Sequence, residues 1–271
     1  MDQGIKRWIV DISHWNPSEN QFYFIISVLP PHERSTITRF VKFKDRKRAF
    51  VSRLLQYSLV HEVSCLPFDS IFIDRTLEGK PFLRNKIVSS FPNFNFNVSH
   101  HGNYVAIVSE PLYLVGLDIV SNEILRQPAT LDFVYGFASY FTALEWKEIV
   151  NAGTLTEVLA SFLRYWSLKE AFVKAIGAGV GFGLNRLEFH HTNWTNISVQ
   201  IDGVESSSWM FWLTKLDERH WASIVRGNPR DATETFKKAF SEHHLKVPNE
   251  GFTIRTVEEL IPTAFMEPFS G

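Results

Sequence analysis

Cysteine is almost absent from this sequence, since Cys65 is the only one in 271 residues. A disulfide within the chain is therefore excluded, and a reducing compartment, the cytoplasm, is predicted. Long apolar runs are also missing, because no stretch approaches the roughly 20 residues that a membrane span requires. The amino-terminal segment MDQGIKRWIVDISHW is too short and too mixed for the apolar part of a secretory leader. These absences predict a soluble protein that neither crosses nor binds a membrane.

An excess of charge of either sign is lacking as well. The 28 Lys and Arg residues nearly balance 29 Asp and Glu residues, so the formal net charge is −1. A general nucleic-acid binder is expected to be strongly basic, and that class is excluded here. Aromatic residues are plentiful, with 24 Phe and 8 Trp, which provides for a sizeable core. The length allows either one large domain or two packed halves.

The order of apolar patterns along the chain predicts an α+β fold. Alternation indicates short strands in the first part, and apolar residues at helical spacing indicate helices between the strands. The predicted elements are a strand at 7–12, a helix within 37–63, strands between 70 and 120, helices near 139–151 and 156–176, and strands between 186 and 227.

The order strand–helix–strands thus occurs twice in the sequence. This repetition predicts two similar halves, residues 1–115 and 116–271, each a small antiparallel sheet packed on helices. The tail after about residue 231 is expected to be helical at first and then irregular. The metal site described below and the tail are both assigned to the second half.

The predicted helix over 162–176 is apolar nearly all round. On a helical wheel, Ser167, Glu170 and Lys174 form one narrow polar strip. Such a helix is usually buried, so the strip is too narrow for a free solvent face. Glu170 and Lys174 are either an ordinary ion pair one turn apart, or charges that require a metal or a ligand. The four glycines that follow at every second position from 177 to 183 indicate either a helix cap and turn or a loop shaped for a ligand.

Two strand patterns upstream also carry polar residues in unusual places. In NFNFNVSHHG, the side chains of Asn97, Ser99 and His101 share a face opposite Phe96 and Val98. In the next strand but one, LYLVGLDIV, Asp118 interrupts an apolar run, where an aspartate is disfavoured. It is either a structural hydrogen-bond acceptor or a ligand of a hard metal ion such as Mg²⁺, for which Glu170 is the obvious second carboxylate.

Basic residues cluster between positions 34 and 53, where eight of the 28 Lys and Arg residues lie. In a chain of nearly neutral charge, this density predicts a local positive patch. The cluster is either a solvated helix face or a surface for a phosphate-rich ligand, an acidic protein partner, or both.

Taken together, four sequence blocks resemble the signatures of the 4′-phosphopantetheinyl transferases. Their order and spacing are similar to the broad-specificity Sfp-like branch, and most similar to its monomeric eukaryotic members. The blocks are RTLEGKP at 75–81, FNVSHHG at 96–102, VGLDIV at 115–120 and WSLKEAFVKAIGAGVGFGL at 166–184.

The resemblance implies two α+β halves related by a pseudo-two-fold axis, with coenzyme A bound between them. It implies transfer of the phosphopantetheine arm to a serine of an apo acyl carrier protein or carrier domain, with release of adenosine 3′,5′-bisphosphate. By the family motif, Asp118 and Glu170 bind Mg²⁺, and Lys174 contacts the diphosphate and assists the leaving group. The positions that match coenzyme A contacts are Arg39, Arg75, Thr76, Leu77, Glu78, Gly79, Lys80, Asn97, Val98, Ser99, His100 and Lys174.

Two positions depart from the family pattern. Many members carry a second acid two residues after the aspartate, where this chain has Val120, and close relatives often carry Gln where it has His101. Glu170 and His101 are the two candidates for the base that accepts the serine proton. A non-catalytic relative that binds coenzyme A or a carrier domain without transfer is the alternative, and Val120 is its main support. The sequence leaves open whether the carriers are of the fatty-acid, peptide-synthetase or reductase type.

Overall fold

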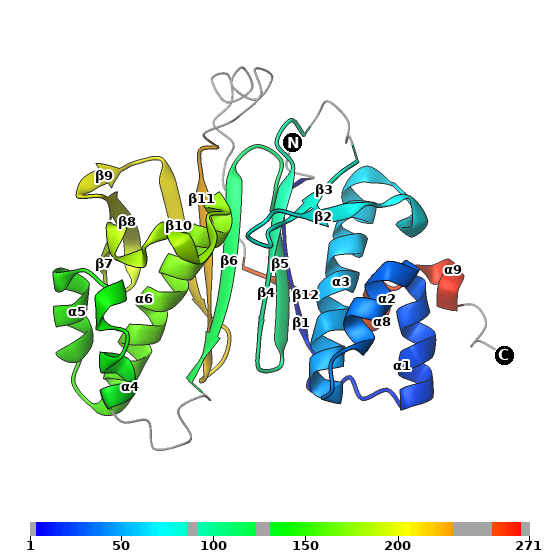
Figure 1. Ribbon diagram of the computed structural model, residues 1–271, viewed down its shortest axis with the longest axis horizontal. Coiled ribbons are helices and arrows are strands. Elements are labelled where there is room, and N and C mark those ends of the chain that lie inside the picture. The colour runs from blue at the N-terminus through cyan, green and yellow to red at the C-terminus, as the bar shows by residue number, and fades with distance from the viewer. Residues whose placement is uncertain (1–3, 86–90, 123–130, 230–250, 267–271) are drawn as a thin grey trace. The chain divides into compact units, whose positions relative to one another are not determined.

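The computed structural model describes residues 4–85, 91–122, 131–229 and 251–266, which form two compact units (Figure 1). The first unit contains residues 1–74, 81–111 and 233–271, and the second contains 75–80 and 112–232. The division differs from the predicted halves at three places, because residues 112–115 and the 75–80 segment group with the second unit and the carboxy-terminal segment groups with the first. As a statement about independent domains, the boundary near residue 115 stays a prediction.

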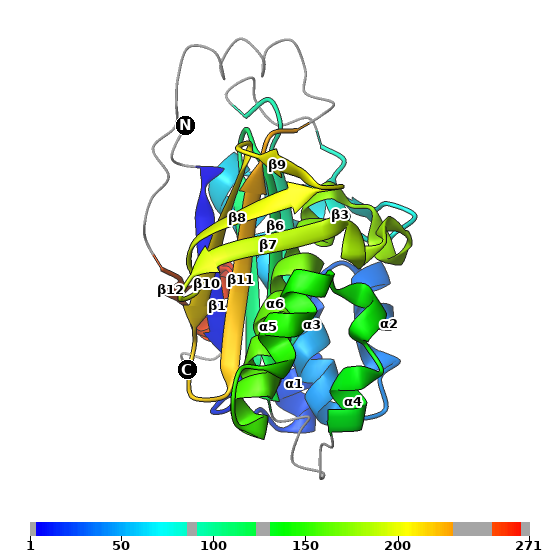
Figure 2. The same ribbon diagram turned by 90° about the vertical axis from the view of Figure 1, so that its left-hand side faces the viewer.

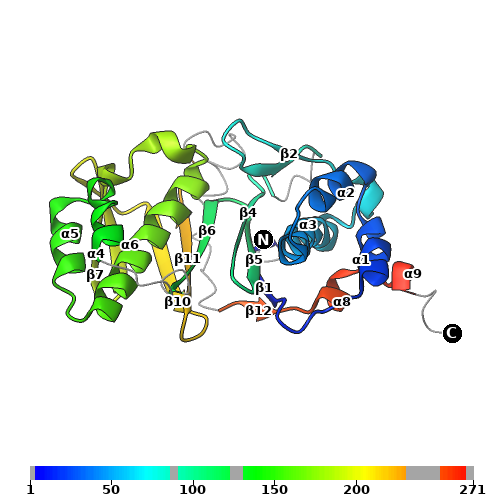
Figure 3. The same cartoon turned by 60° about the horizontal axis from the view of Figure 1, so that its bottom comes forward.

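The first unit contains a four-stranded, mainly antiparallel sheet packed against a long helix. Strands β1 (Lys6–Asp11), β5 (Tyr104–Glu110) and β4 (Asn95–His101) pair antiparallel, and the short β12 (Thr253–Ile254) adds to the other edge of β1 in parallel. Helix α3 (Phe43–Ser64) packs on this sheet, and Figure 3 shows α1, α2 and α8 around it. The remaining elements of the unit are α1 (Glu19–Ile25), α2 (Pro31–Thr38), α8 (Val257–Leu260), α9 (Thr263–Met266), β3 (Pro81–Leu83) and most of β2 (Ile73–Arg75).

Residues from both ends of the chain build the core of this unit. Leu54, Leu55 and Val60 of α3 are fully buried against Phe96 and Ile107 of the sheet. Val257 and Leu260 of α8 belong to the same core, and the Ser58 hydroxyl donates to the Leu260 carbonyl at 2.7 Å. The carboxy-terminal segment therefore completes a core whose other residues come from the first half of the chain.

The second unit has a three-stranded antiparallel sheet, β10 (Trp209–Lys215), β11 (His220–Gly227) and β6 (Leu114–Ser121), covered by helix α6 (Leu155–Ile176). A second sheet, β7 (Leu187–Thr192), β8 (Thr195–Ile201) and β9 (Val204–Ser206), lies beside β10 (Figure 2). Helix α5 (Ala143–Val150) packs on α6, as does the short α4 (Leu131–Tyr135).

Helix α6 begins and ends at residues that specify its limits. The Thr154 hydroxyl and the Glu157 carboxylate form a reciprocal capping box at its amino end. At its other end Gly177 takes a left-handed conformation, φ 68°, which glycine adopts without a steric penalty. The first glycine of the predicted loop is thus a helix cap.

The prediction of an α+β fold built from small antiparallel sheets and helices is confirmed. The 37–63 pattern covers two helices, because α2 ends at Thr38 and α3 begins only at Phe43. The first part of the predicted helical tail, 230–250, lies outside the described residues, and the part from 251 to 266 forms a short strand and two short helices. No helix in the described part of the chain is both long enough and apolar enough to cross a membrane.

Candidate functional site

The predicted site residues are distributed over both units. Asp118, Glu170 and Lys174 lie in the second unit, together with the hairpin tip 75–80. Arg39 and the strand segment 97–101 lie in the first unit.

Three of the predicted residues form one charged cluster where β6 meets α6. Lys174 Nζ donates to Asp118 Oδ1 at 2.5 Å, with the Asp118 side chain 10% and the Lys174 side chain 32% exposed. Glu170, one turn before Lys174, is half-buried and close enough to Asp118 for the two negative charges to interact. The polar strip on α6 therefore faces the aspartate of the apolar strand, which spacing alone did not establish.

Burial and like charge act together on Glu170. Loss of solvent raises the pKa of the Glu170 carboxyl, the charge of Asp118 raises it further, and Lys174 lowers it. A carboxylate in this position is held at an electrostatic cost that a bound cation would relieve.

Gly116 allows β6 and α6 to approach this closely. A Cβ atom built on Gly116 would lie 1.9 Å from the carbonyl oxygen of Ala171 and 2.7 Å from the Ala175 nitrogen. Both atoms belong to the helix backbone, so no side-chain movement would remove the overlap. The glycine two residues before Asp118 therefore brings the aspartate within reach of the helix.

Val120 lies on the same face of β6, two residues after Asp118. It is 5% exposed and belongs to the apolar core that Leu168 and Phe172 of α6 also form. The position where many family members carry a second acid is thus filled by a core side chain. Strand β6 therefore supplies one carboxylate, that of Asp118, to this site.

The donor set of the cluster fits a magnesium ion. Two carboxylates are the usual protein contribution to Mg²⁺, which otherwise keeps water and substrate phosphate oxygens. Among the residues that the structure describes, no group of three or more His, Cys, Asp and Glu side chains gathers as a metal site. Asp118 and Glu170 are therefore suited to a metal that substrate phosphates help to hold.

The hairpin tip 75–80 packs on the carboxy-terminal end of α6. Lys80 Nζ donates to the carbonyl oxygen of Ala175 at 2.5 Å, which satisfies one of the free carbonyls at the helix end. Burial lowers the pKa of Lys80 to about 8. A Cβ on Gly179 would lie 3.1 Å from Cβ of Glu78, so the glycine segment also contacts this tip.

The tip itself is a tight turn. The Thr76 nitrogen donates to the Lys80 carbonyl, and the Gly79 nitrogen to the Thr76 carbonyl, both at 2.9 Å. Gly79 has φ 89°, which an L-residue rarely adopts. Leu77 at the tip is fully exposed. The block recognised in the sequence as RTLEGKP is therefore a preformed loop beside the carboxylate–lysine cluster.

A buried ion pair that the sequence did not predict attaches the same helix to α5. Lys169 Nζ lies 2.7 Å from Glu145 Oε2, and both side chains are 0% exposed. Lys169 also donates to the carbonyls of Leu184 and Leu187, and Glu145 Oε1 accepts from the Phe189 nitrogen. Burial lowers the pKa of Lys169 and raises that of Glu145, and each charge opposes the shift of the other. The signal in the sequence was a lysine on the apolar side of the helical wheel.

The candidate residues of the first unit other than Arg39 lie along strand β4. Asn97 and Ser99 are buried, 4% and 6% exposed, whereas His100 is exposed and His101 is half-buried beside the turn at Gly102. Phe96 lies in the core and Val98 packs against it, as the alternating pattern predicted. The strand continues directly into the turn, where Arg48 of α3 donates to the Gly102 carbonyl at 3.3 Å.

Most of the basic cluster at 34–53 serves the fold of this unit. Arg53 pairs with Glu33 at 2.7 Å, and Arg48 pairs with Asp45. Other side chains donate to backbone or amide oxygens: Arg34 to the carbonyls of Ser27 and Leu29, Arg46 to that of Phe40, and Lys47 to Asn16. Arg39, Lys42 and Lys44 are exposed to solvent. The positively charged surface therefore contains fewer residues than the eight of the sequence cluster.

Comparison with known families matches both parts of the chain. Residues 13–112 match the family described as 4′-phosphopantetheinyl transferase, N-terminal. Residues 114–225 match the family described as 4′-phosphopantetheinyl transferase superfamily. The second match contains Asp118, Glu170 and Lys174.

Curated relatives resemble the chain over most of its length. The mouse protein named L-aminoadipate-semialdehyde dehydrogenase-phosphopantetheinyl transferase is 32% identical over 266 residues, covering 95% of this chain and 85% of the relative. A protein of Thraustochytrium sp. named phosphopantetheinyl transferase is 33% identical over 228 residues, covering 82% of this chain and 78% of the relative.

A solved structure titled Chronobacterium ammoniagenes ACPS-CoA complex is more distant. It is 19% identical, has a TM-score of 0.30, and covers 44% of this chain and 98% of the solved chain. A TM-score this low does not support membership of a family. The sequence matches do, and they extend over both units. The chain belongs to the 4′-phosphopantetheinyl transferase superfamily.

Proposed function

We propose that this enzyme transfers the 4′-phosphopantetheine arm of coenzyme A to a serine hydroxyl of an apo carrier protein. The serine oxygen forms a bond to the β-phosphorus, and the bond from that phosphorus to the bridging oxygen breaks. Adenosine 3′,5′-bisphosphate leaves, and a base accepts the serine proton. The observation that carries the proposal is the Asp118–Glu170–Lys174 cluster in a chain of this superfamily.

The carboxylates Asp118 and Glu170 are the proposed ligands of Mg²⁺. A bound magnesium ion supplies neutralisation of the diphosphate charge. The raised pKa of Glu170 supports this role. Two adjacent, partly buried carboxylates repel each other, and a bound cation would reduce that repulsion. Val120 supplies no ligand, so water and substrate phosphate oxygens would have to supply the remaining ones.

Lys174 is the proposed electrostatic partner of the leaving group. Its ammonium lies 2.5 Å from Asp118 Oδ1, so a metal ion held by that carboxylate would compete with Lys174 for it. With a cation on Asp118, the ammonium would be able to donate to the bridging oxygen, where negative charge develops.

Glu170 and His101 remain the two candidate bases. Burial and Asp118 raise the pKa of Glu170, which makes that carboxylate a stronger base than an exposed one. His101 stands at the end of β4, half-buried, in the strand that also carries Asn97 and Ser99. His101→Gln tests the histidine alone, because it preserves hydrogen bonding but removes a proton acceptor.

The proposed contacts of coenzyme A are Arg39, the tip residues Arg75, Thr76, Leu77, Glu78, Gly79 and Lys80, the β4 residues Asn97, Val98, Ser99 and His100, and Lys174. The tip is a hydrogen-bonded turn, and a pKa of about 8 leaves Lys80 mostly charged at neutral pH. The exposed Arg39, Lys42 and Lys44 fit the phosphates of coenzyme A or an acidic carrier surface. A monomeric state and a cytoplasmic location remain predictions.

A non-catalytic binder of coenzyme A or of a carrier domain is the second candidate. The specific observation in its favour is Val120, a core residue at the position of a family acid. Against it, the aspartate, the glutamate and the lysine are all present and gathered in one cluster.

Mass spectrometry of an apo acyl carrier protein and an apo peptidyl carrier protein, each incubated with this protein, coenzyme A and Mg²⁺, distinguishes the two. We expect a gain of one phosphopantetheine arm on at least one carrier, lost on chelation and restored by Mg²⁺. Asp118→Asn and Glu170→Gln are expected to lower the rate about 100-fold or more, whereas the exposed Glu205→Gln is the matched control. No mass gain on any carrier, with coenzyme A still bound in calorimetry, would establish the non-catalytic function instead.

A further inference from the structure

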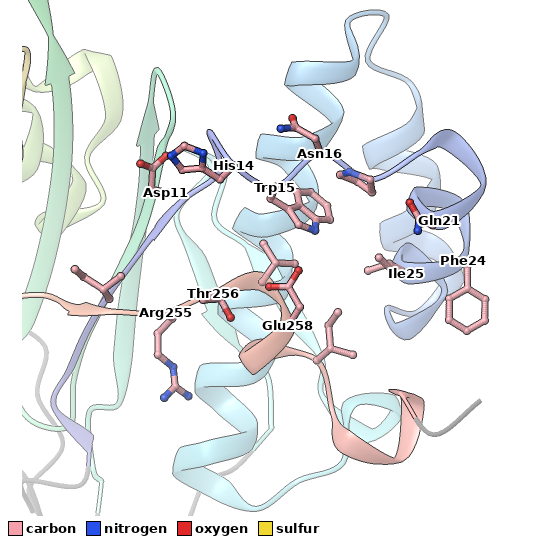
Figure 4. A pocket seen from close by; sticks show the side chains of 14 residues that line it. Asp11, His14, Trp15, Asn16, Gln21, Phe24, Ile25, Arg255, Thr256 and Glu258 are labelled. Carbon is pink, nitrogen blue, oxygen red and sulfur yellow. The ribbon is translucent and has the colours of Figure 1, made fainter. Parts of the chain in front are cut away.

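An apolar cavity of about 610 Å³ lies within the first unit, between the segment from Asp11 to Ile25 and the carboxy-terminal segment from Ile254 to Ile261 (Figure 4). None of the residues that line it belongs to the proposed transferase site. Its volume is within the range of small-molecule sites, about 300–1,000 Å³.

The walls of this cavity are mainly aromatic and aliphatic. Trp15, Phe24 and Ile25 line one part, and Val257 and Ile261 of the carboxy-terminal segment line another. The Trp15 ring is fixed from behind, because it stacks on Phe50 of the core at 5.6 Å with an interplanar angle of 26°. The cavity therefore has a preformed aromatic wall.

The charged side chains that line the cavity are Asp11, Glu258 and Arg255. Figure 4 shows Glu258 on the side of Trp15, and Asp11 apart from it beside His14. Asp11 Oδ1 accepts from the Ser13 nitrogen at 2.8 Å. The Arg255 side chain points away from Trp15 and Glu258 (Figure 4). The Arg255 guanidinium lies 4.8 Å from the Trp8 ring centroid and donates to Glu62 at 3.4 Å. The Glu258 carboxylate is therefore the acidic group that lies on the side of Trp15.

The carboxy-terminal wall is attached firmly to the rest of the unit. Strand β12 pairs with β1, the Arg255 nitrogen donates to the Ile9 carbonyl at 2.9 Å, and Val257 is 2% exposed in the core. The opposite wall is equally fixed, since α1 begins at a capping box formed by Ser18 and Gln21. A ligand would thus meet two walls that are ordered in its absence.

From these observations we propose that this cavity binds a small amphipathic organic cation, with an apolar body against Trp15, Ile25 and Val257 and an ammonium group at Glu258. Apolar walls accommodate an aliphatic or aromatic body, and a carboxylate beside them pairs with an ammonium group. The Lys47 ammonium lies 5.7 Å from the Trp15 ring centroid and donates to Asn16 at 3.1 Å, and Lys47 does not line the cavity. This site is independent of coenzyme A and of transfer.

Three probes with the same body test the charge preference: phenylbutylamine, phenylbutanol and phenylbutyrate. Isothermal titration of the full chain measures the dissociation constant of each. We expect the amine to bind about fivefold more tightly than the alcohol, as for a partly exposed ion pair, and the carboxylate to bind most weakly. Equal affinity for amine and alcohol, tighter binding of the carboxylate, or no binding of the amine would overturn the proposal.

Variants then locate the site. Glu258→Gln is expected to remove the preference for the amine and leave the affinity for the alcohol unchanged. Glu19→Gln, an exposed carboxylate on the same helix as Phe24 that does not line the cavity, is the matched control. Ile25→Trp fills the cavity and is expected to weaken all three probes, with circular dichroism confirming the fold. A preference for the amine that persists in Glu258→Gln, or binding unchanged in Ile25→Trp, would place the site elsewhere and contradict the proposal.

Discussion

At the scale of single residues, the cluster of Asp118, Glu170 and Lys174 combines two like charges with one opposite charge in a partly buried place. Without a metal ion, Lys174 alone among the three offsets the repulsion between the carboxylates. The arrangement is suited to binding a cation and is correspondingly unfavourable for folding. Stability and activity should therefore respond in opposite directions at Glu170.

Glu170→Gln is expected to stabilise the metal-free protein at neutral pH and to lower transferase activity about 100-fold. The gain in thermal midpoint should vanish near pH 4, because the raised pKa of Glu170 means that the folded wild type also carries the neutral acid there. It should appear as pH rises above the ordinary carboxyl pKa. Lys174→Met should instead lower stability by about 1 kcal/mol. Thermal unfolding from pH 4 to 8 measures both, and equal midpoints for wild type and Glu170→Gln at pH 8 would contradict the argument.

At the scale of elements, the site depends on how closely β6 approaches α6. Gly116 faces the helix backbone, and the buried pair Lys169–Glu145 holds the same helix to α5 and to the chain around Leu184. The helix that carries Glu170 and Lys174 is thus fixed at several points along its length.

Gly116→Ala is expected to destabilise the protein by about 3 kcal/mol or more, because the added methyl group would meet helix backbone atoms. Urea unfolding measures the free energy. Gly181→Ala is the matched control, since a Cβ there meets no atom within 4 Å and its φ is not positive. A small effect of Gly116→Ala, comparable to that of Gly181→Ala, would show that β6 and α6 are not packed as described.

At the scale of the whole chain, residues far apart in sequence close the first unit. β12 joins the edge of β1, and Leu260 of α8 is 3% exposed in a core built mainly by residues before 110. The amino-terminal unit is therefore incomplete without the carboxy-terminal segment.

Leu260→Ala is expected to lower the free energy of unfolding by roughly 2–4 kcal/mol, as for other buried leucines. Ile254→Ala, in the same segment but 77% exposed, should change it by about 0.5 kcal/mol or less. Chemical denaturation of both variants measures the difference. Similar effects of the two substitutions would mean that α8 does not contribute to the core.

The sequence by itself determined the family, the α+β class and most elements, because these depend on local periodicity and on short ordered motifs. It also identified Glu170 and Lys174 as neighbours on one helix face, since that follows from helical geometry. The carboxy-terminal limit of α6 was readable from Gly177 for the same local reason.

Only the tertiary structure decided which distant residues meet. It placed Asp118 beside Lys174, showed that Val120 is a core residue, and directed five of the eight basic residues of 34–53 into structural contacts. It revealed Lys169 paired with Glu145, and a cavity between the two ends of the chain. These contacts join segments up to about 200 residues apart, and the periodicity of a sequence describes one element at a time, so it contains no direct information about them.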